Sequence, residues 1–141
     1  MFILDKRLEE DTAAVGSFEL SQVLLHKDSQ FPWCILVPQR ENIQEIHHLS
    51  QADAQQLMRE SCHLAEVMTD LFAPNKMNVA ALGNIVSQLH IHHIARFTKD
   101  PAWPQPVWGK TAAVPYSEEA LSHRIQALRY ALEGSAIEFN V

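Results

Sequence analysis

The segment from Gln88 to Phe97, QLHIHHIARF, alternates between polar and apolar side chains, and this alternation restricts it to one kind of element. Successive side chains of a β-strand point to opposite faces of a sheet, whereas a helix would scatter the two sets around its axis. One strand face then carries Gln88, His90, His92, Ile94 and Arg96, and the other carries Leu89, Ile91, His93, Ala95 and Phe97. We therefore predict a strand over 88–97 whose mostly apolar face packs in the core. His93, which shares that face, is expected to be a hydrogen-bonded structural histidine.

The rest of the chain predicts a small fold of strands and helices. The other expected elements are strands over 18–26, 31–37 and 77–82 and helices that begin at Ser50 and Ser117. The first two strands are separated only by the polar turn KDSQ, which predicts an antiparallel hairpin. Both helices start at a serine, a favoured N-cap residue, and continue with apolar residues at steps of three and four. This order indicates an α+β fold with a mostly antiparallel sheet and two main helices.

The length of 141 residues predicts one domain spanning 1–141. Its core is expected over about 18–97, followed by a C-terminal loop and helix over 98–134. The segment 99–109, KDPAWPQPVWG, holds three prolines and two tryptophans, so it cannot form a helix or a central strand. We expect an ordered loop that packs against another part of the molecule.

Charge and cysteine content limit the partners and the compartment. The formal net charge is −6 and the eleven Lys and Arg residues are scattered, which argues against a protein that binds polymeric nucleic acid. Cys34 and Cys62 each lie in an apolar stretch, as is typical of buried thiols in a reducing compartment. The N-terminal sequence lacks the pattern of a signal peptide, and no stretch has the roughly 18 apolar residues of a membrane span. The sequence therefore predicts a cytoplasmic protein.

The polar face of the predicted 88–97 strand suggests chemistry on a phosphate. A neutral imidazole can attack phosphorus and leave a phosphoramidate, which divides one difficult displacement into two easier ones. A second imidazole, an amide and a guanidinium on the same face would stabilise charge on the phosphate oxygens. Two alternatives stay open: a polar sheet face that is merely solvated, and a zinc site, because His90 and His92 have a spacing that zinc ligands use. A zinc site would need a third ligand, such as His26, His47 or His63.

The same residues resemble the signature of the histidine triad (HIT) superfamily, His-φ-His-φ-His-φ-φ, where φ is hydrophobic. Matching Ala95-Arg96 to the end of that signature puts Gln88, His90 and His92 at the three triad positions. Upstream, GNIVS at 83–87 resembles the family's glycine, amide and hydroxyl residues that contact phosphate, and CILVPQR at 34–40 resembles a strand that ends in Pro and a basic residue. DPAWPQPVWG, together with the Pro-Trp pair near residue 32, resembles a bacterial subgroup of HIT proteins.

This resemblance implies a HIT-like fold, a homodimer built around a continuous sheet, and a nucleotide as the small-molecule substrate. His90 would attack the α-phosphate of a nucleotide conjugate, and water would release the nucleoside monophosphate from the nucleotidyl-His90 intermediate without a metal or other cofactor. Dinucleoside polyphosphates, whose hydrolases the chain resembles, and nucleoside phosphoramidates are the implied substrates. The expected catalytic residues are His90, His92 and Gln88, and the expected substrate-binding residues are Asn84, Ser87, Arg96, Lys27 and Asp28.

Two departures from the family pattern concern the rate and the ribose. Gln88 replaces the first histidine, although an amide can both donate and accept hydrogen bonds. Lys27 occupies the place of an expected Asn or Asp that would hold the ribose hydroxyls, and Asp28 is the candidate substitute. The alternative from another functional class is a nucleotide-binding or zinc-binding protein that uses the same His-x-His strand without turnover.

Overall fold

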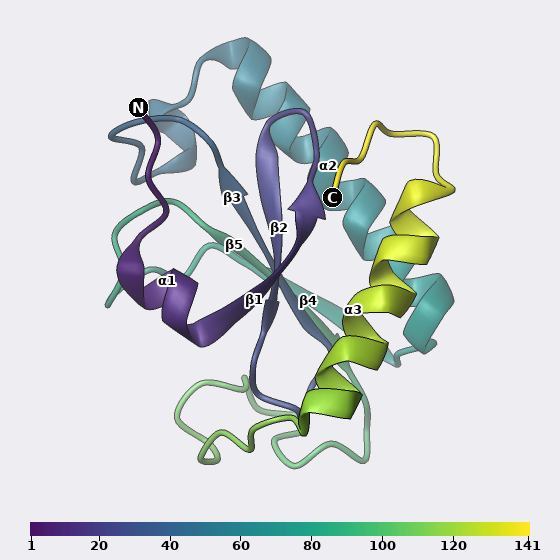
Figure 1. Ribbon diagram of the computed structural model, residues 1–141. Coiled ribbons are helices and arrows are strands. Elements are labelled where there is room, and N and C mark those ends of the chain that lie inside the picture. Colours follow the sequence, from purple (N-terminus) through teal and green to yellow (C-terminus); the bar gives the residue numbers. More distant parts are fainter.

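A five-stranded sheet with two long helices on one face forms the body of the molecule (Figure 1). The computed structural model describes residues 1–141. Its strands are β1 (Thr12–Ser17), β2 (Ser21–His26), β3 (Trp33–Pro38), β4 (Lys76–Ala80) and β5 (Ile91–Arg96). Its helices are α1 (Lys6–Asp11), the 3-10 helix η1 (Ile46–His48), α2 (Gln51–Phe72) and α3 (Glu118–Glu133). The strand order is β1-β2-β3-β5-β4, and every neighbouring pair is antiparallel. No helix has both the length and the apolar character that crossing a bilayer requires.

The predicted α+β class, the antiparallel sheet and the two main helices are confirmed. β2 and β3 form the predicted hairpin, in which Leu24 pairs with Ile35. Ser50 caps α2 as expected, since its hydroxyl accepts a hydrogen bond from the Asp53 N–H at 3.1 Å. The strands are shorter than predicted, and β5 begins only at Ile91, so His90 lies immediately before the strand. The sequence pattern predicts neither helix α1 nor strand β1.

The sheet is buried on both faces. On one face, Leu25, Cys34 and Leu36 pack against apolar residues of α2 and α3, in a core that includes Leu57, Leu64, Met68, Leu128 and Leu132. The opposite face carries a second core around Trp33, Ile35 and Ile94. Leu8 of α1 and the loop residues Ala102 and Val107 pack in this second core. The loop at 99–109 is therefore ordered and packed, as its prolines and tryptophans suggested.

A buried ion pair fixes the start of this loop. The Arg96 guanidinium contacts both carboxylate oxygens of Asp100, at 2.8 and 3.1 Å. It also donates to the Asn78 side chain and to the Gln105 carbonyl, each at 2.8 Å. Partial burial opposes ionisation of Asp100, but hydrogen bonds from Arg96 and from three backbone N–H groups lower its pKa to about 2. The pair joins the end of β5 to the loop that covers the second core.

Candidate functional site

His90 and His92 project from the same side of the sheet, on the face that α1 and the 99–109 loop cover. Their ring centroids are 4.8 Å apart and the rings are nearly perpendicular, at 76°. Each is only 5% exposed. The alternation that predicted a shared face for these two histidines therefore holds across the start of β5.

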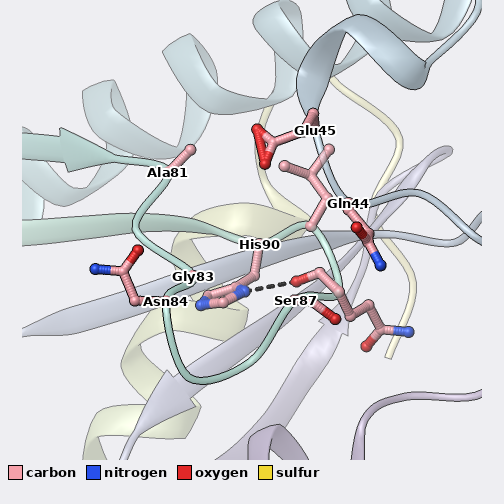
Figure 2. Close-up of a pocket in the computed structure, with 9 residues that line it drawn as sticks. Gln44, Glu45, Ala81, Gly83, Asn84, Ser87 and His90 are labelled. Atoms are coloured by element: carbon pink, nitrogen blue, oxygen red, sulfur yellow. Dashed lines mark hydrogen bonds between the residues drawn. The ribbon is translucent and has the colours of Figure 1, made fainter.

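The hydrogen bond of His90 determines which of its nitrogens is free. His90 Nδ1 lies 2.7 Å from the backbone carbonyl oxygen of Gln88 (Figure 2). A carbonyl oxygen can only accept, so Nδ1 carries the proton and donates it to this bond. In the neutral ring, Nε2 then holds an unshared electron pair. This is the nitrogen that can act as a nucleophile.

His92 has the opposite arrangement of donor and acceptor. The indole Nε1–H of Trp33 donates to His92 Nδ1 at 3.0 Å, and an indole N–H cannot accept. The proton of the neutral ring is therefore on Nε2, which donates to the Leu82 carbonyl at 3.2 Å. Burial, assisted by the neighbouring His90, lowers the pKa of His92 to about 4. His92 is accordingly neutral at pH 7.

Two cavities meet at His90. The smaller, of about 140 Å³, is lined mostly by polar residues and is drawn in Figure 2; its lining includes Gln44, Glu45 and Ser87. The larger, of about 320 Å³, is lined mainly by apolar and aromatic residues, among them Ile35, Val86 and the three rings described below. Gly83, Asn84 and His90 line both cavities. A phosphate beside His90 would therefore have a polar space on one side and an apolar space on the other.

The loop at 83–87 approaches His90 so closely that one position has no room for a side chain. A Cβ atom built on Gly83 would lie 2.6 Å from the Val86 carbonyl oxygen and 3.3 Å from His90 Cε1. Only glycine lets the backbone pass here. Figure 2 shows Gly83, Asn84 and Ser87 along the loop that borders the His90 ring. The structure therefore brings the predicted residues Asn84 and Ser87 to the same place as His90.

The aromatic rings of Trp33, His26 and Trp108 form one side of the larger cavity. The His26 ring stacks on Trp33, with centroids 3.9 Å apart and planes at 11°. Trp108 packs nearly perpendicular to Trp33 and to His92, with ring centroids 5.8 and 4.9 Å away. The sequence pattern pointed to neither Trp33 nor Trp108, and it offered His26 only as a possible third ligand of a zinc site. The tryptophans of the Pro-Trp pair and of the proline-rich loop were the available signal, but neither segment indicates what it packs against.

The predicted residue Gln88 is near His90, but its side chain points to the N-terminal segment. Its amide oxygen accepts from the Asp5 N–H and its amide nitrogen donates to the Ile3 carbonyl, each at 2.8 Å. Only the backbone carbonyl of Gln88 contacts His90. Gln88 thus joins residues 3–5 to the turn that holds the His90 ring.

Three other predicted substrate-binding residues lie outside both cavities. Arg96 is held in the buried ion pair with Asp100 and is 1% exposed. The ammonium group of Lys27 donates to the Glu10 carbonyl at 3.0 Å. The Asp28 carboxylate accepts from the backbone N–H groups of Gln30 and Val114, at 3.1 and 3.2 Å. The structure gives each of these side chains partners within the protein instead of bringing them beside His90.

His93 faces the helices, as predicted. Its Nε2 lies 2.7 Å from the Ser61 hydroxyl, and its Nδ1 donates to the Ile91 carbonyl at 3.1 Å. Burial lowers the pKa of His93 to about 4. The zinc alternative would need a third ligand beside His90 and His92, and no three His, Cys, Asp or Glu side chains group as a metal site.

This chain matches one protein-family model and is similar to several solved structures. The family model described as HIT domain matches residues 7–99. The crystal structure of a histidine triad protein from Marinobacter aquaeolei VT8 is 50% identical, with a TM-score of 0.92, over 94% of this chain and 97% of that chain. A histidine triad protein from Bradyrhizobium japonicum is 42% identical, with a TM-score of 0.90, over 92% of this chain and 97% of that chain. One from Sinorhizobium meliloti 1021 is 44% identical, with a TM-score of 0.88, over 96% and 98%. A search of curated proteins finds no match.

Proposed function

Because the chain belongs to the histidine triad (HIT) family, we propose that it is a nucleotidyl hydrolase or transferase that uses His90 as its nucleophile. The observation that carries this proposal is the His90 tautomer, since the Gln88 carbonyl holds the proton on Nδ1 and leaves the Nε2 electron pair free. The free nitrogen belongs to a ring that lines two cavities of different polarity. A phosphoester with an apolar group on one side of phosphorus suits this arrangement.

In the proposed reaction, His90 Nε2 attacks the α-phosphorus of a nucleotide conjugate. A P–N bond to His90 forms as the bond from phosphorus to the leaving group breaks, and the electron pair of that bond departs with the leaving group. Water then attacks the same phosphorus and gives a proton to the solvent, the electron pair of the P–N bond returns to His90 Nε2, and the nucleoside monophosphate is released. The covalent intermediate divides one displacement into two.

The surrounding residues supply stabilisation of charge and a place for the nucleoside. Asn84 and Ser87 can donate hydrogen bonds to the phosphate oxygens, and the missing side chain at Gly83 lets the loop backbone approach them. The aromatic cavity at Trp33 and Trp108 suits the nucleobase and sugar, because an apolar pocket with flat side chains favours a planar ring. Dinucleoside polyphosphates and nucleoside phosphoramidates are the substrate classes that we propose.

The proposal extends to assembly and compartment. We propose a homodimer in which two sheets join through β4, an edge strand that pairs only with β5. Cys34 is buried as expected, whereas Cys62 is exposed on α2. Neither cysteine forms a disulfide, which favours a reducing compartment such as the cytoplasm. Light scattering coupled to gel filtration measures the mass in solution, and a monomeric mass at micromolar concentration would contradict the proposed homodimer.

Trapping the intermediate tests the proposed reaction. The wild-type protein, incubated with a dinucleoside polyphosphate or a nucleoside phosphoramidate and denatured at alkaline pH, should gain the mass of one nucleotidyl group. His90→Ala should form no adduct and lose several orders of magnitude in turnover, each tenfold corresponding to about 1.4 kcal/mol of barrier. His123→Ala is the matched control, because His123 is exposed on α3, and it should behave as wild type. Turnover by His90→Ala at a near-wild-type rate would refute the assignment. Tight nucleotide binding without adduct or turnover would favour the alternative function, a nucleotide-binding protein that does not catalyse a reaction.

A further inference from the structure

We propose that Trp33 is a positioning residue for the reaction at His90: its indole N–H fixes the tautomer of His92, and His92 then holds the backbone carbonyl that precedes the loop at 83–87. The proposal rests on the proposed function for its kinetic consequence only, because the tautomer is a property of the protein alone. The observation behind it is a continuous chain of hydrogen bonds. Trp33 Nε1–H donates to His92 Nδ1 at 3.0 Å, and His92 Nε2–H donates to the Leu82 carbonyl at 3.2 Å.

The chemistry of the two end groups permits only one direction of donation. An indole N–H can only donate and a carbonyl can only accept. If the His92 proton moved to Nδ1, two N–H groups would face each other at Trp33 and two electron pairs would face each other at Leu82. Both hydrogen bonds would then be lost at once. Only the tautomer with the proton on Nε2 can therefore make both hydrogen bonds of His92.

Trp33 is itself held firmly enough to impose this choice. It is 5% exposed, and its ring stacks on His26 at 3.9 Å. The rings of Phe31 and Trp108 pack nearly perpendicular to it, with centroids 6.4 and 5.8 Å away. These contacts depend on the flat ring, whereas the bond to His92 depends on one N–H group. Trp33→Phe therefore removes the donor and keeps a flat aromatic ring for the stack.

The chain of hydrogen bonds ends beside the loop that borders His90. Leu82 precedes Gly83, and the Gly83–Ser87 loop lines both cavities. Without the bond from His92, the Leu82 carbonyl at the start of the loop loses its hydrogen-bond partner. Displacement of a substrate-positioning group by about 1 Å can reduce a rate by about a hundredfold. The His90 tautomer depends on Gln88 instead, so the nucleophile itself should survive the loss of Trp33 Nε1.

Nitrogen-15 NMR of the histidine rings at pH 7 tests the proposal directly. In the wild-type protein, His92 should be protonated on Nε2 and not on Nδ1. Trp33→Phe should show a mixture of tautomers or a charged ring, because a proton on Nδ1 then no longer faces an opposing N–H and only the Leu82 carbonyl still favours Nε2. Trp108→Phe is the matched control and should keep the wild-type tautomer, because the Trp108 ring packs against His92 without a hydrogen bond to it. Trp33→Phe should also lower kcat/KM by roughly tenfold to a hundredfold, and it should still form the nucleotidyl adduct that His90→Ala cannot form.

Each result has one interpretation. A wild-type His92 protonated on Nδ1 would overturn the proposal, and this measurement stands even if Trp33→Phe fails to fold. A folded Trp33→Phe protein with the wild-type tautomer would overturn it as well, whatever its activity. If neither the wild-type protein nor any variant turned over a substrate, the proposed function would be refuted instead. The NMR result would then still decide the role of Trp33.

Discussion

His90 and His92 are neighbours in space with their protons on opposite ring nitrogens. A backbone carbonyl holds the proton of His90 on Nδ1, and an indole N–H keeps the proton of His92 on Nε2. In many active sites a carboxylate orients the catalytic imidazole. Here neutral groups orient both rings, and Glu45 is the one carboxylate among the residues that line the smaller cavity.

His93 should contribute to stability and not to the reaction. Its ring is fully buried and both of its nitrogens are hydrogen-bonded, to Ser61 and to the Ile91 carbonyl. His93→Ala should lower the free energy of unfolding by roughly 1–3 kcal/mol, because it leaves a cavity and an unpaired hydroxyl. Urea unfolding and an activity assay on the same preparation measure both effects. An unchanged stability with lost activity would show that His93 belongs to the reaction.

At this scale the sequence predicts the face of a side chain better than its partner. Alternation along a strand is a property of the backbone, so it places His90 and His92 together and His93 opposite. It also places Arg96 on the His92 face, but it does not reveal that Asp100 binds the guanidinium at the far end of the strand. The position of Trp33 beside His92 depends on the pairing of β3 with β5, which no local pattern shows.

Among the elements, the loop at 83–87 carries the proposed phosphate site. If it binds phosphate, a nucleoside monophosphate should bind more tightly than its parent nucleoside. Asn84→Ala combined with Ser87→Ala should remove most of that difference, because hydrogen bonds to charged groups contribute about 1.5–3 kcal/mol each. Calorimetric titration of both ligands against both proteins measures it.

Two outcomes of the titration would contradict this prediction, and each has a different meaning. Equal affinity of the wild type for nucleoside and monophosphate would remove the phosphate site from this loop. An unchanged difference in the double variant would instead assign the site to backbone N–H groups. Ser122→Ala, on the exposed surface of α3, is a suitable control for the loss of a serine hydroxyl.

The long elements could be predicted from the sequence, whereas the short N-terminal ones could not. Helix α2 shows a clear apolar stripe and a serine cap over 22 residues. Helix α1 has only six residues, KRLEED, and one buried side chain, Leu8. Strand β1, TAAVGS, is interrupted by an irregularity between Ala14 and Gly16, so its burial pattern does not alternate. Both elements depend on contacts made by the folded chain, such as the Gln88 amide that binds the Asp5 N–H before α1.

For the molecule as a whole, the neutral buried histidines predict loss of stability in mild acid. Burial lowers the pKa of His92 and His93 to about 4, whereas an unfolded chain has histidines near 6.5. Between these values the unfolded state binds more protons, so acidification favours unfolding. Each of the two residues should reduce the free energy of unfolding by about 1.4 kcal/mol per pH unit in this window. Below about pH 4 their contribution becomes constant.

Urea unfolding at pH 7 and at pH 5 measures how the free energy of unfolding depends on pH, in a range where most carboxylates stay ionised. The free energy of unfolding should be lower at pH 5, and His93→Gln should reduce the difference, because the variant lacks one of the titrating rings. His123→Gln removes an exposed histidine and should leave the difference as it is. Equal stability of the wild-type protein at the two pH values would show that these histidines are not buried in their neutral form.

Trp33 and Trp108, which line the larger cavity, also provide an intrinsic fluorescence signal for ligand binding. Of the three tryptophans, these two line the cavity, and the third, Trp103, lies near the Arg96 guanidinium outside it. A nucleobase that enters the cavity would displace water from the two indoles and quench their emission by contact. Titration of intrinsic fluorescence can therefore follow ligand entry without a label. Trp108→Phe and Trp33→Phe would assign the signal to one indole or the other.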